Sequence, residues 1–312
     1  MTRPLFGLHL PSYTYPGSPP DRIFDRTLEL ALAAESAGVG LITVMDHYHQ
    51  IANVGAEDEP MLEAYTTLSA LAARTSNVRL AALVTGVTYR NPAMLAKIVT
   101  TLDAVSHGRA ILGLGAAWNE SEHVAYGWSF PPIGERMDRL DEALTICRLM
   151  FTQPRATFEG RYYHIRGAIN EPRPVQPGGP GILIGGTGER RTLRLAARHA
   201  DLTNWFGTLE QLRHTNEVLL RHCEAEGRDP STILRTAMVP FVLARDERAA
   251  AAAVARLTPE RRAQMSVATP EQGAEQLRQY TEAGIGGFVF RNAAVRTVED
   301  VGLVGELIAL MS

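Results

Sequence analysis

Two adjacent residues, Asp46 and His47, follow a short apolar run and place a carboxylate beside an imidazole. An imidazole gains and loses a proton near neutral pH, so this pair suits hydrogen bonding and proton transfer to a bound substrate or cofactor. His49 comes two residues later, and we expect it to be an exposed loop residue. We predict that His47 and Asp46 are catalytic.

The stretch from Arg109 to His123 joins a short apolar run to a chemically rich polar loop. Gly113 and Gly115 have no Cβ, so another backbone or a flat ligand can approach the end of this run closely. Trp118 then offers an aromatic plane, and residues 119–123 bring five hydrogen-bonding or titratable side chains. We choose His123 from this loop as a third catalytic candidate.

A third candidate site is the glycine-rich run from Gly185 to Gly188, between a predicted strand and a predicted helix. Free backbone N–H groups at the start of a helix suit a phosphate, and Arg190 and Arg191 could add positive charge. The same run also fits a tight turn without a ligand. Trp205, which ends the next apolar run, would either wall off a planar ring or pack under a loop.

These residues need a scaffold, and the chain alternates short apolar runs with longer segments of helical period. We expect strands at 5–10, 41–45, 78–84, 109–115, 182–184, 202–206, 235–244 and 287–290. We expect helices at 21–37, 61–74, 91–105, 134–151, up to 199, 209–226, 247–257, 270–283 and 298–311, and an aromatic hairpin at 157–164. Asn91 and Pro92 suit the start of the third helix.

Eight strands that are each followed by a helix predict an α/β fold, a (β/α)8 TIM barrel with insertions. Leu10 to Tyr13 lacks the glycines of a dinucleotide-binding turn, which argues against a doubly wound sheet. Active sites of such barrels lie at the carboxyl ends of the strands. The candidate residues above all follow predicted strands, so they would share one face.

Composition limits the classes of function. The chain has 312 residues, 45% of them hydrophobic and 21% charged, with a net charge of -3. We expect one domain over 1–312 that is cytoplasmic and binds neither nucleic acid nor membrane, because it lacks a basic excess, a signal peptide and a long apolar stretch. Cys147 and Cys223 lie far apart in helical patterns, which argues against a disulfide framework.

Several of these stretches together resemble the luciferase-like monooxygenase superfamily, and most of all its branch that uses the deazaflavin coenzyme F420. The resemblance is carried by Asp46-His47, by 83–92 with Ala96-Lys97, by 108–118, by 130–137 and by 184–188. It implies a barrel with the cofactor ring in its mouth, and the bond from Leu83 to Val84 matches a non-prolyl cis peptide that backs the ring in similar proteins. It also implies a homodimer.

The resemblance implies an F420-dependent oxidoreductase that moves a hydride between the deazaflavin and a small organic substrate. His47 would donate the proton or orient the ring. We expect the cofactor to contact Asp46, His47, Leu83, Val84, Thr85, Gly115, Ala116, Trp118, Gly185, Gly186, Thr187, Gly188 and Trp205. The branch that oxidises sugar phosphates has a glutamate after the glycines of the fourth strand, where the matching residue here is Trp118, so oxidation of glucose 6-phosphate is not expected.

Three alternatives stay open. The first is an FMN-dependent monooxygenase of the same superfamily that uses oxygen and a partner reductase. If Arg190, Arg191, Arg90 and Lys97 lined a long groove for an anionic tail, this would favour F420 over FMN. The others are a metal-dependent hydrolase that uses His47 and His49 as ligands, and a barrel that binds a flavin without catalysis.

Overall fold

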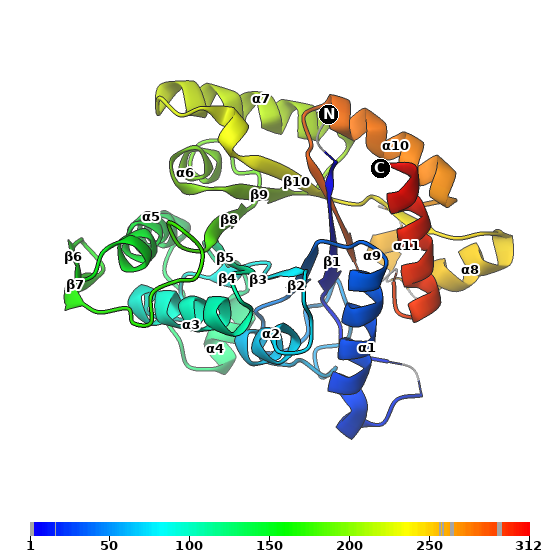
Figure 1. Ribbon diagram of the computed structural model, residues 1–312, viewed down its shortest axis with the longest axis horizontal. Helices are drawn as coiled ribbons and strands as arrows, with labels where there is room; N and C mark the ends of the chain where they lie inside the picture. Colours follow the sequence, from blue (N-terminus) through cyan, green and yellow to red (C-terminus); the bar gives the residue numbers. More distant parts are fainter. Residues whose placement is uncertain (1–2, 16, 256, 258, 263–264, 292–294) are drawn as a thin grey trace.

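Eight parallel strands close into a barrel in the computed structural model, which describes residues 3–15, 17–255, 257, 259–262, 265–291 and 295–312 (Figure 1). The barrel strands are β1 (Leu5–Leu10), β2 (Leu41–Val44), β3 (Arg79–Ala82), β5 (Ala110–Gly115), β8 (Gly181–Gly185), β9 (Leu202–Trp205), β10 (Leu234–Met238) and β13 (Gly287–Arg291). Neighbours pair in that order, and β1 pairs with β13 to close the ring. The predicted (β/α)8 fold is confirmed.

Helices surround the barrel. The side chains that point outward from the strands are apolar, and the helices bury them. The outer helices are α1 (Ile23–Ser36), α2 (Ala64–Ala72), α3 (Pro92–Val105), α5 (Ile133–Thr152), α6 (Thr192–His199), α7 (Leu209–Ala225), α10 (Pro270–Glu282) and α11 (Val298–Leu310). Asn91 caps α3 by accepting the Ala93 N–H, with Pro92 in the first turn, as predicted. None of the helices in the described ranges is long and apolar enough to cross a membrane.

A small apolar cluster fills the inside of the barrel at the end opposite the carboxyl ends of the strands. Its buried members come from five neighbouring strands: Leu41, Ala81, Ile111, Leu183 and Leu202. These side chains plug the barrel, as in other barrels of this class, so a ligand can enter only from the opposite end. That end is where the strands terminate.

The expected strand 78–84 is interrupted. β3 ends at Ala82, the peptide bond between Leu83 and Val84 is cis, and the chain resumes as the two-residue β4 (Thr85–Gly86) beside β5. The cis bond that the resemblance implied is confirmed.

The expected strand 235–244 is wrong at its second half. The barrel strand β10 stops at Met238, and β11 (Phe241–Leu243) pairs outside the barrel with β12 (Ser266–Ala268). Pro240 between them has no N–H with which to continue the ladder. The segment 247–257 gives α8 (Glu247–Ala255), residue 256 lies outside the described residues, and α9 (Pro259–Arg262) follows.

Two insertions complete the chain. The predicted hairpin is present as β6 (Ala156–Glu159) and β7 (His164–Ala168), which pair antiparallel. The polar loop that we expected at 119–123 is instead mostly helical, as α4 (Glu120–Ala125). Helical geometry matters here because it turns Glu122 and His123 into the protein rather than toward solvent.

Candidate functional site

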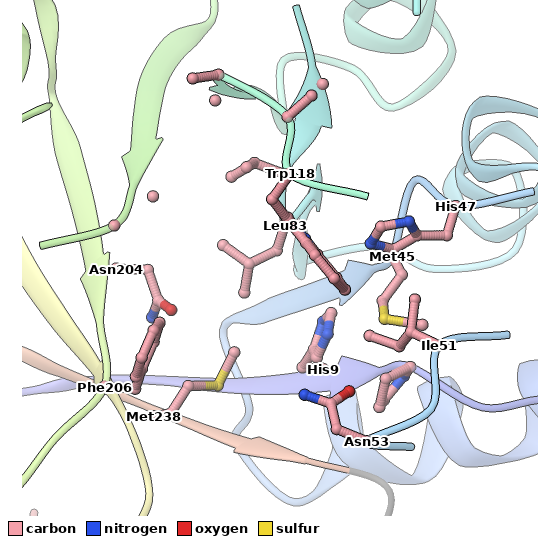
Figure 2. A pocket seen from close by; sticks show the side chains of 18 of the residues that line it. His9, Met45, His47, Ile51, Asn53, Leu83, Trp118, Asn204, Phe206 and Met238 are labelled. Atoms are coloured by element: carbon pink, nitrogen blue, oxygen red, sulfur yellow. The ribbon is translucent and has the colours of Figure 1, made fainter. Parts of the chain in front are cut away.

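A cavity of about 540 Å³ opens at the carboxyl ends of the barrel strands, where sites of this fold are found. This volume suits a cofactor ring with a small substrate. Figure 2 shows Asn204, Phe206 and Met238 on one side and Met45, His47 and Ile51 on the other, with Trp118 extending between them. Of the predicted site residues, the lining includes His47, Leu83, Val84, Gly115, Ala116, Trp118, Gly185 and Gly186.

The floor of the cavity is the turn at Leu83 and Val84, and glycines make room for it. A Cβ on Gly115 would lie 2.8 Å from Val84 Cγ2, and one on Gly185 would lie 3.2 Å from Val84 Cγ1. A Cβ on Gly113 would lie only 1.9 Å from the carbonyl oxygen of Ala82. Glycine is required at these three positions because the segment 82–84 approaches them closely. The result is an apolar surface with few side chains, which fits a flat ring.

His47 is held at the edge of this floor by a buried carboxylate. Its Nδ1 lies 2.7 Å from Oε2 of Glu122, whose side chain is 0% exposed. Since an ionised carboxylate can only accept, Nδ1 carries the hydrogen, and Nε2 is the ring nitrogen left for a ligand. The ring also meets Trp118 edge to face, with 5.5 Å between centroids.

Glu122 binds more than His47. It accepts the Tyr48 N–H at 2.6 Å and the Tyr89 hydroxyl at 2.8 Å. Burial alone would raise its pKa, but these hydrogen bonds and the charge of His47 outweigh burial and lower the pKa to about 2. Glu122 is therefore a fixed anion at neutral pH and can stabilise positive charge on His47, as the buried carboxylate does in a catalytic triad.

Asp46 points away from the cavity. Successive residues of an extended segment face opposite sides, so Asp46 and His47 diverge although they are adjacent. Asp46 forms a bidentate ion pair with Arg90 at 2.5 and 3.1 Å, and Arg90 also binds Glu63 at 2.7 Å. Burial raises the pKa of Asp46, and the guanidinium of Arg90 partly offsets this. The carboxylate partner of His47 is Glu122, not its neighbour in sequence.

His123 is also outside the cavity, because α4 buries it completely. Its Nδ1 bonds to the carbonyl of Asn119 at 2.7 Å and its Nε2 to the hydroxyl of Thr88 at 2.7 Å. Its ring stacks on Tyr89 and packs against Phe130. With both nitrogens bonded to the protein, His123 is placed to support the wall behind Glu122 and not to exchange a proton with a ligand.

Two more predicted residues lie elsewhere. Trp205 is 0% exposed and belongs to the core between sheet and helices, because strand alternation turns Asn204 and Phe206 inward in its place. Thr85 is buried and bonds to the Tyr65 hydroxyl at 2.6 Å. The structure does not bring either side chain to the cavity.

The glycine run after β8 lies partly in the lining. Gly185 and Gly186 line the cavity, Gly186 has φ of +109°, and Thr192 at the start of α6 adds a hydroxyl beside them. Thr187 and Gly188 lie outside the lining. This arrangement leaves the predicted phosphate role in place as a prediction.

The four cations that would mark a groove for an anionic cofactor tail are not among the residues that line the cavity. Arg90 is held by Asp46, Arg191 binds Asp138 and the Gly134 carbonyl, and Lys97 binds the Glu171 carbonyl. Arg190 is exposed on the loop before α6. They therefore do not distinguish F420 from FMN. Within the described ranges, no group of three His, Cys, Asp or Glu side chains could hold a metal ion.

Sequence reasoning missed several parts of the site. The sequence offered Glu122 as one of several acids in an expected loop. Only the prediction of a helix over this segment would have indicated that Glu122 is buried. Asn204 and Phe206 could have been found by applying strand alternation to 202–206. The other unpredicted lining residues include His9, Met45, Asn53, Met238 and Arg291, which come from β1, the β2 loop, β10 and β13.

Comparison with known proteins agrees with this architecture. The sequence model of the family described as luciferase-like monooxygenase matches residues 6–284. An uncharacterised protein of Mycobacterium tuberculosis is 33% identical over 265 residues, which covers 79% of this chain and 92% of the relative. The F420-dependent glucose-6-phosphate dehydrogenase of Kineococcus radiotolerans is 37% identical over 164 residues, 49% of this chain and 47% of that protein.

Solved structures share the fold at low identity. An F420-dependent secondary alcohol dehydrogenase in complex with an F420–acetone adduct superposes with a TM-score of 0.84 and 19% identity over 100% of both chains. The EDTA monooxygenase of Chelativorans superposes with a TM-score of 0.84 and 17% identity, over 99% of this chain and 94% of the other. At this identity the similarity shows the fold alone.

Proposed function

The chain belongs to the luciferase-like monooxygenase family, and we propose that it is an F420-dependent oxidoreductase that transfers a hydride between the deazaflavin and a small organic substrate. The observation that carries the proposal is the cavity itself. It combines an apolar floor at Leu83 and Val84 with one well-held imidazole, His47. The F420-dependent relatives named above support this choice of cofactor.

The floor residues fit a planar ring, and we assign them to the cofactor. Leu83 and Val84 would contact one face, Gly115 and Gly185 keep the surface free of side chains, and Trp118 would cover the edge. When bound, F420 supplies or accepts the hydride. The backbone at Gly185 and Gly186, with the hydroxyl of Thr192, is placed to bind its phosphate.

His47 handles the proton that accompanies the hydride. When the substrate is reduced, the protonated imidazole gives up the hydrogen on Nε2, while Nδ1 keeps its bond to Glu122. The reverse reaction returns the proton to Nε2. Glu122 holds the ring in one orientation and stabilises its positive charge, so it acts as a positioning residue and not as a catalytic one.

Glucose 6-phosphate is not the substrate that this cavity favours. No Asp or Glu lies among the lining residues that the structure describes, so the cavity lacks a carboxylate acid or base for a sugar hydroxyl. Met45, Ile51, Phe206 and Met238 instead give apolar walls. We propose a compact substrate with a carbonyl or an activated double bond.

The FMN-dependent monooxygenase is the second candidate, favoured by the fold it shares with the EDTA monooxygenase. Its reaction would need oxygen and a separate reductase. That the protein is one cytoplasmic domain and a homodimer stays a prediction.

Anaerobic turnover tests the proposal. Reduced F420 is mixed with 2-cyclohexenone, and return of the oxidised deazaflavin absorbance is followed for wild type and His47→Asn. We expect turnover by wild type, and a fall of about 10²- to 10⁴-fold in kcat for the variant with little change in the Kd for F420. Equal rates in the two proteins would refute the role of His47, and tight F420 binding without turnover of any acceptor in a wider panel would refute the reductase.

A further inference from the structure

An arginine on the far wall of the cavity is not used by the mechanism above. Arg291 is the last residue of β13, in register with His9 of β1, and both line the cavity. Alternation along β13 turns Val289 and Arg291 inward and Phe288 and Phe290 outward into the core. The Arg291 side chain is partly buried, and it forms no hydrogen bond or ion pair with the residues that the structure describes.

The charge of the cavity makes this arginine informative. Arg291 is the only Lys or Arg among the described lining residues, and that lining holds no Asp or Glu. The nearby acids of the site are engaged elsewhere, Asp46 with Arg90 and Glu122 with His47. Removing water from a guanidinium that has no carboxylate partner costs free energy. A ligand that carries an anionic group would offset this cost and would therefore bind strongly.

The barrel order shows which part of a ligand Arg291 can reach. The floor belongs to the β3, β5 and β8 arc, whereas Asn204, Met238 and Arg291 lie at or near the carboxyl ends of the consecutive strands β9, β10 and β13 on the other arc. Phe206 and Met238 stand on that second arc, apart from His47 (Figure 2). A cofactor ring on the floor would leave the second arc to the substrate.

We propose that Arg291 is a specificity-determining residue that binds a carboxylate on the substrate. This inference rests on the proposed function, since it places the cofactor on the floor. A single guanidinium matches the charge and planar geometry of one carboxylate, whereas a phosphate dianion would call for more cations than the described lining provides. The substrate class is a small unsaturated or keto carboxylic acid.

The test compares two probes that differ in charge and by one methyl group. 3-Oxocyclohex-1-ene-1-carboxylate and its methyl ester are titrated by calorimetry into wild type, Arg291→Gln and Arg291→Lys, with and without F420. Arg213→Gln is the matched control. Arg213 is exposed on α7, so its substitution removes the same charge at a position outside the cavity. The KM of each probe with reduced F420 is measured in parallel.

We expect wild type and Arg213→Gln to prefer the carboxylate. Arg291→Gln should weaken carboxylate binding by roughly 10- to 100-fold and leave the ester within about 2-fold, since a charge-assisted hydrogen bond is lost. Arg291→Lys should keep part of the preference, and the Kd for F420 should not change.

Two results would overturn the inference. Equal binding of carboxylate and ester by wild type would remove the anion subsite. A weaker Kd for F420 in Arg291→Gln, with both probes affected alike, would assign the arginine to the cofactor. Failure of the proposed function looks different, because F420 would then not bind, while the charge preference would still be measurable in the protein without cofactor.

Discussion

Replacing Glu122 by Gln tests the buried contact on which the geometry of His47 depends. The carboxyl group has an ordinary pKa of 4.5 and a pKa of about 2 in the folded protein. This difference corresponds to about 3 kcal/mol of folding free energy at neutral pH. Because the Gln amide can still accept the Tyr48 N–H, we expect Glu122→Gln to lose up to about 3 kcal/mol at pH 7.

The pH dependence makes the prediction specific. A pKa that is lowered on folding contributes stability that is complete above 4.5 and is lost as pH falls from 4.5 toward 2. Wild type should therefore give up about 0.8 kcal/mol of this contribution by pH 4.0, whereas the amide gives up none. The stability gap between wild type and variant must narrow by that amount.

Urea unfolding of wild type, Glu122→Gln and Glu120→Gln at pH 7.0 and 4.0 measures this gap. Glu120 is exposed on the first turn of the same helix, so its substitution controls for charge without burial. A gap of constant size at both pH values, or an equal loss in Glu120→Gln, would refute the argument. In turnover, Glu122→Gln should lower kcat more than it raises KM. The amide would donate to Nδ1 of His47 and favour the neutral ring with its hydrogen on Nε2, and no carboxylate would stabilise the protonated imidazole that donates to the substrate.

The remaining predictions concern the floor and the rim of the cavity. Gly113→Ala should cost about 3 kcal/mol or more in urea unfolding, because its Cβ would meet the backbone oxygen of Ala82, whereas Gly134→Ala, which has open space, should cost nothing; equal effects would contradict the floor geometry. Trp118 is 61% exposed and lines the cavity while Trp205 is fully buried, so Trp118→Phe should remove most of the tryptophan fluorescence quenching by F420 and Trp205→Phe should keep it. The opposite pattern would place the ring elsewhere.

The sequence predicts the barrel well because its evidence is local and repeated. Most apolar runs are barrel strands and most segments of helical period are helices, and a cap such as Asn91 is a contact between near neighbours. Errors occur where one residue ends the pattern. Pro240 stops the barrel ladder, so β11 leaves the sheet, although 235–244 reads as one apolar run.

The site is predicted less well because it depends on which way each side chain points. His47, Trp118 and the glycines line the cavity, but Asp46 and Trp205 face away from it because alternation in extended chain moves neighbours to opposite sides. His123 was placed in a loop, and its burial depends on α4 and on the aromatic side chains around it. The contact between His47 and Glu122 spans 75 positions in sequence, so no local pattern could indicate it.

The measurement that bears most directly on the proposed function is a parallel titration of the purified protein with F420 and with FMN, followed by fluorescence quenching and calorimetry. We predict a Kd for F420 in the micromolar range or below and no comparable response to FMN. Tight binding of FMN without a response to F420 would contradict the hydride-transfer proposal and favour the oxygen-dependent monooxygenase. Binding of neither would indicate a barrel that does not use a flavin.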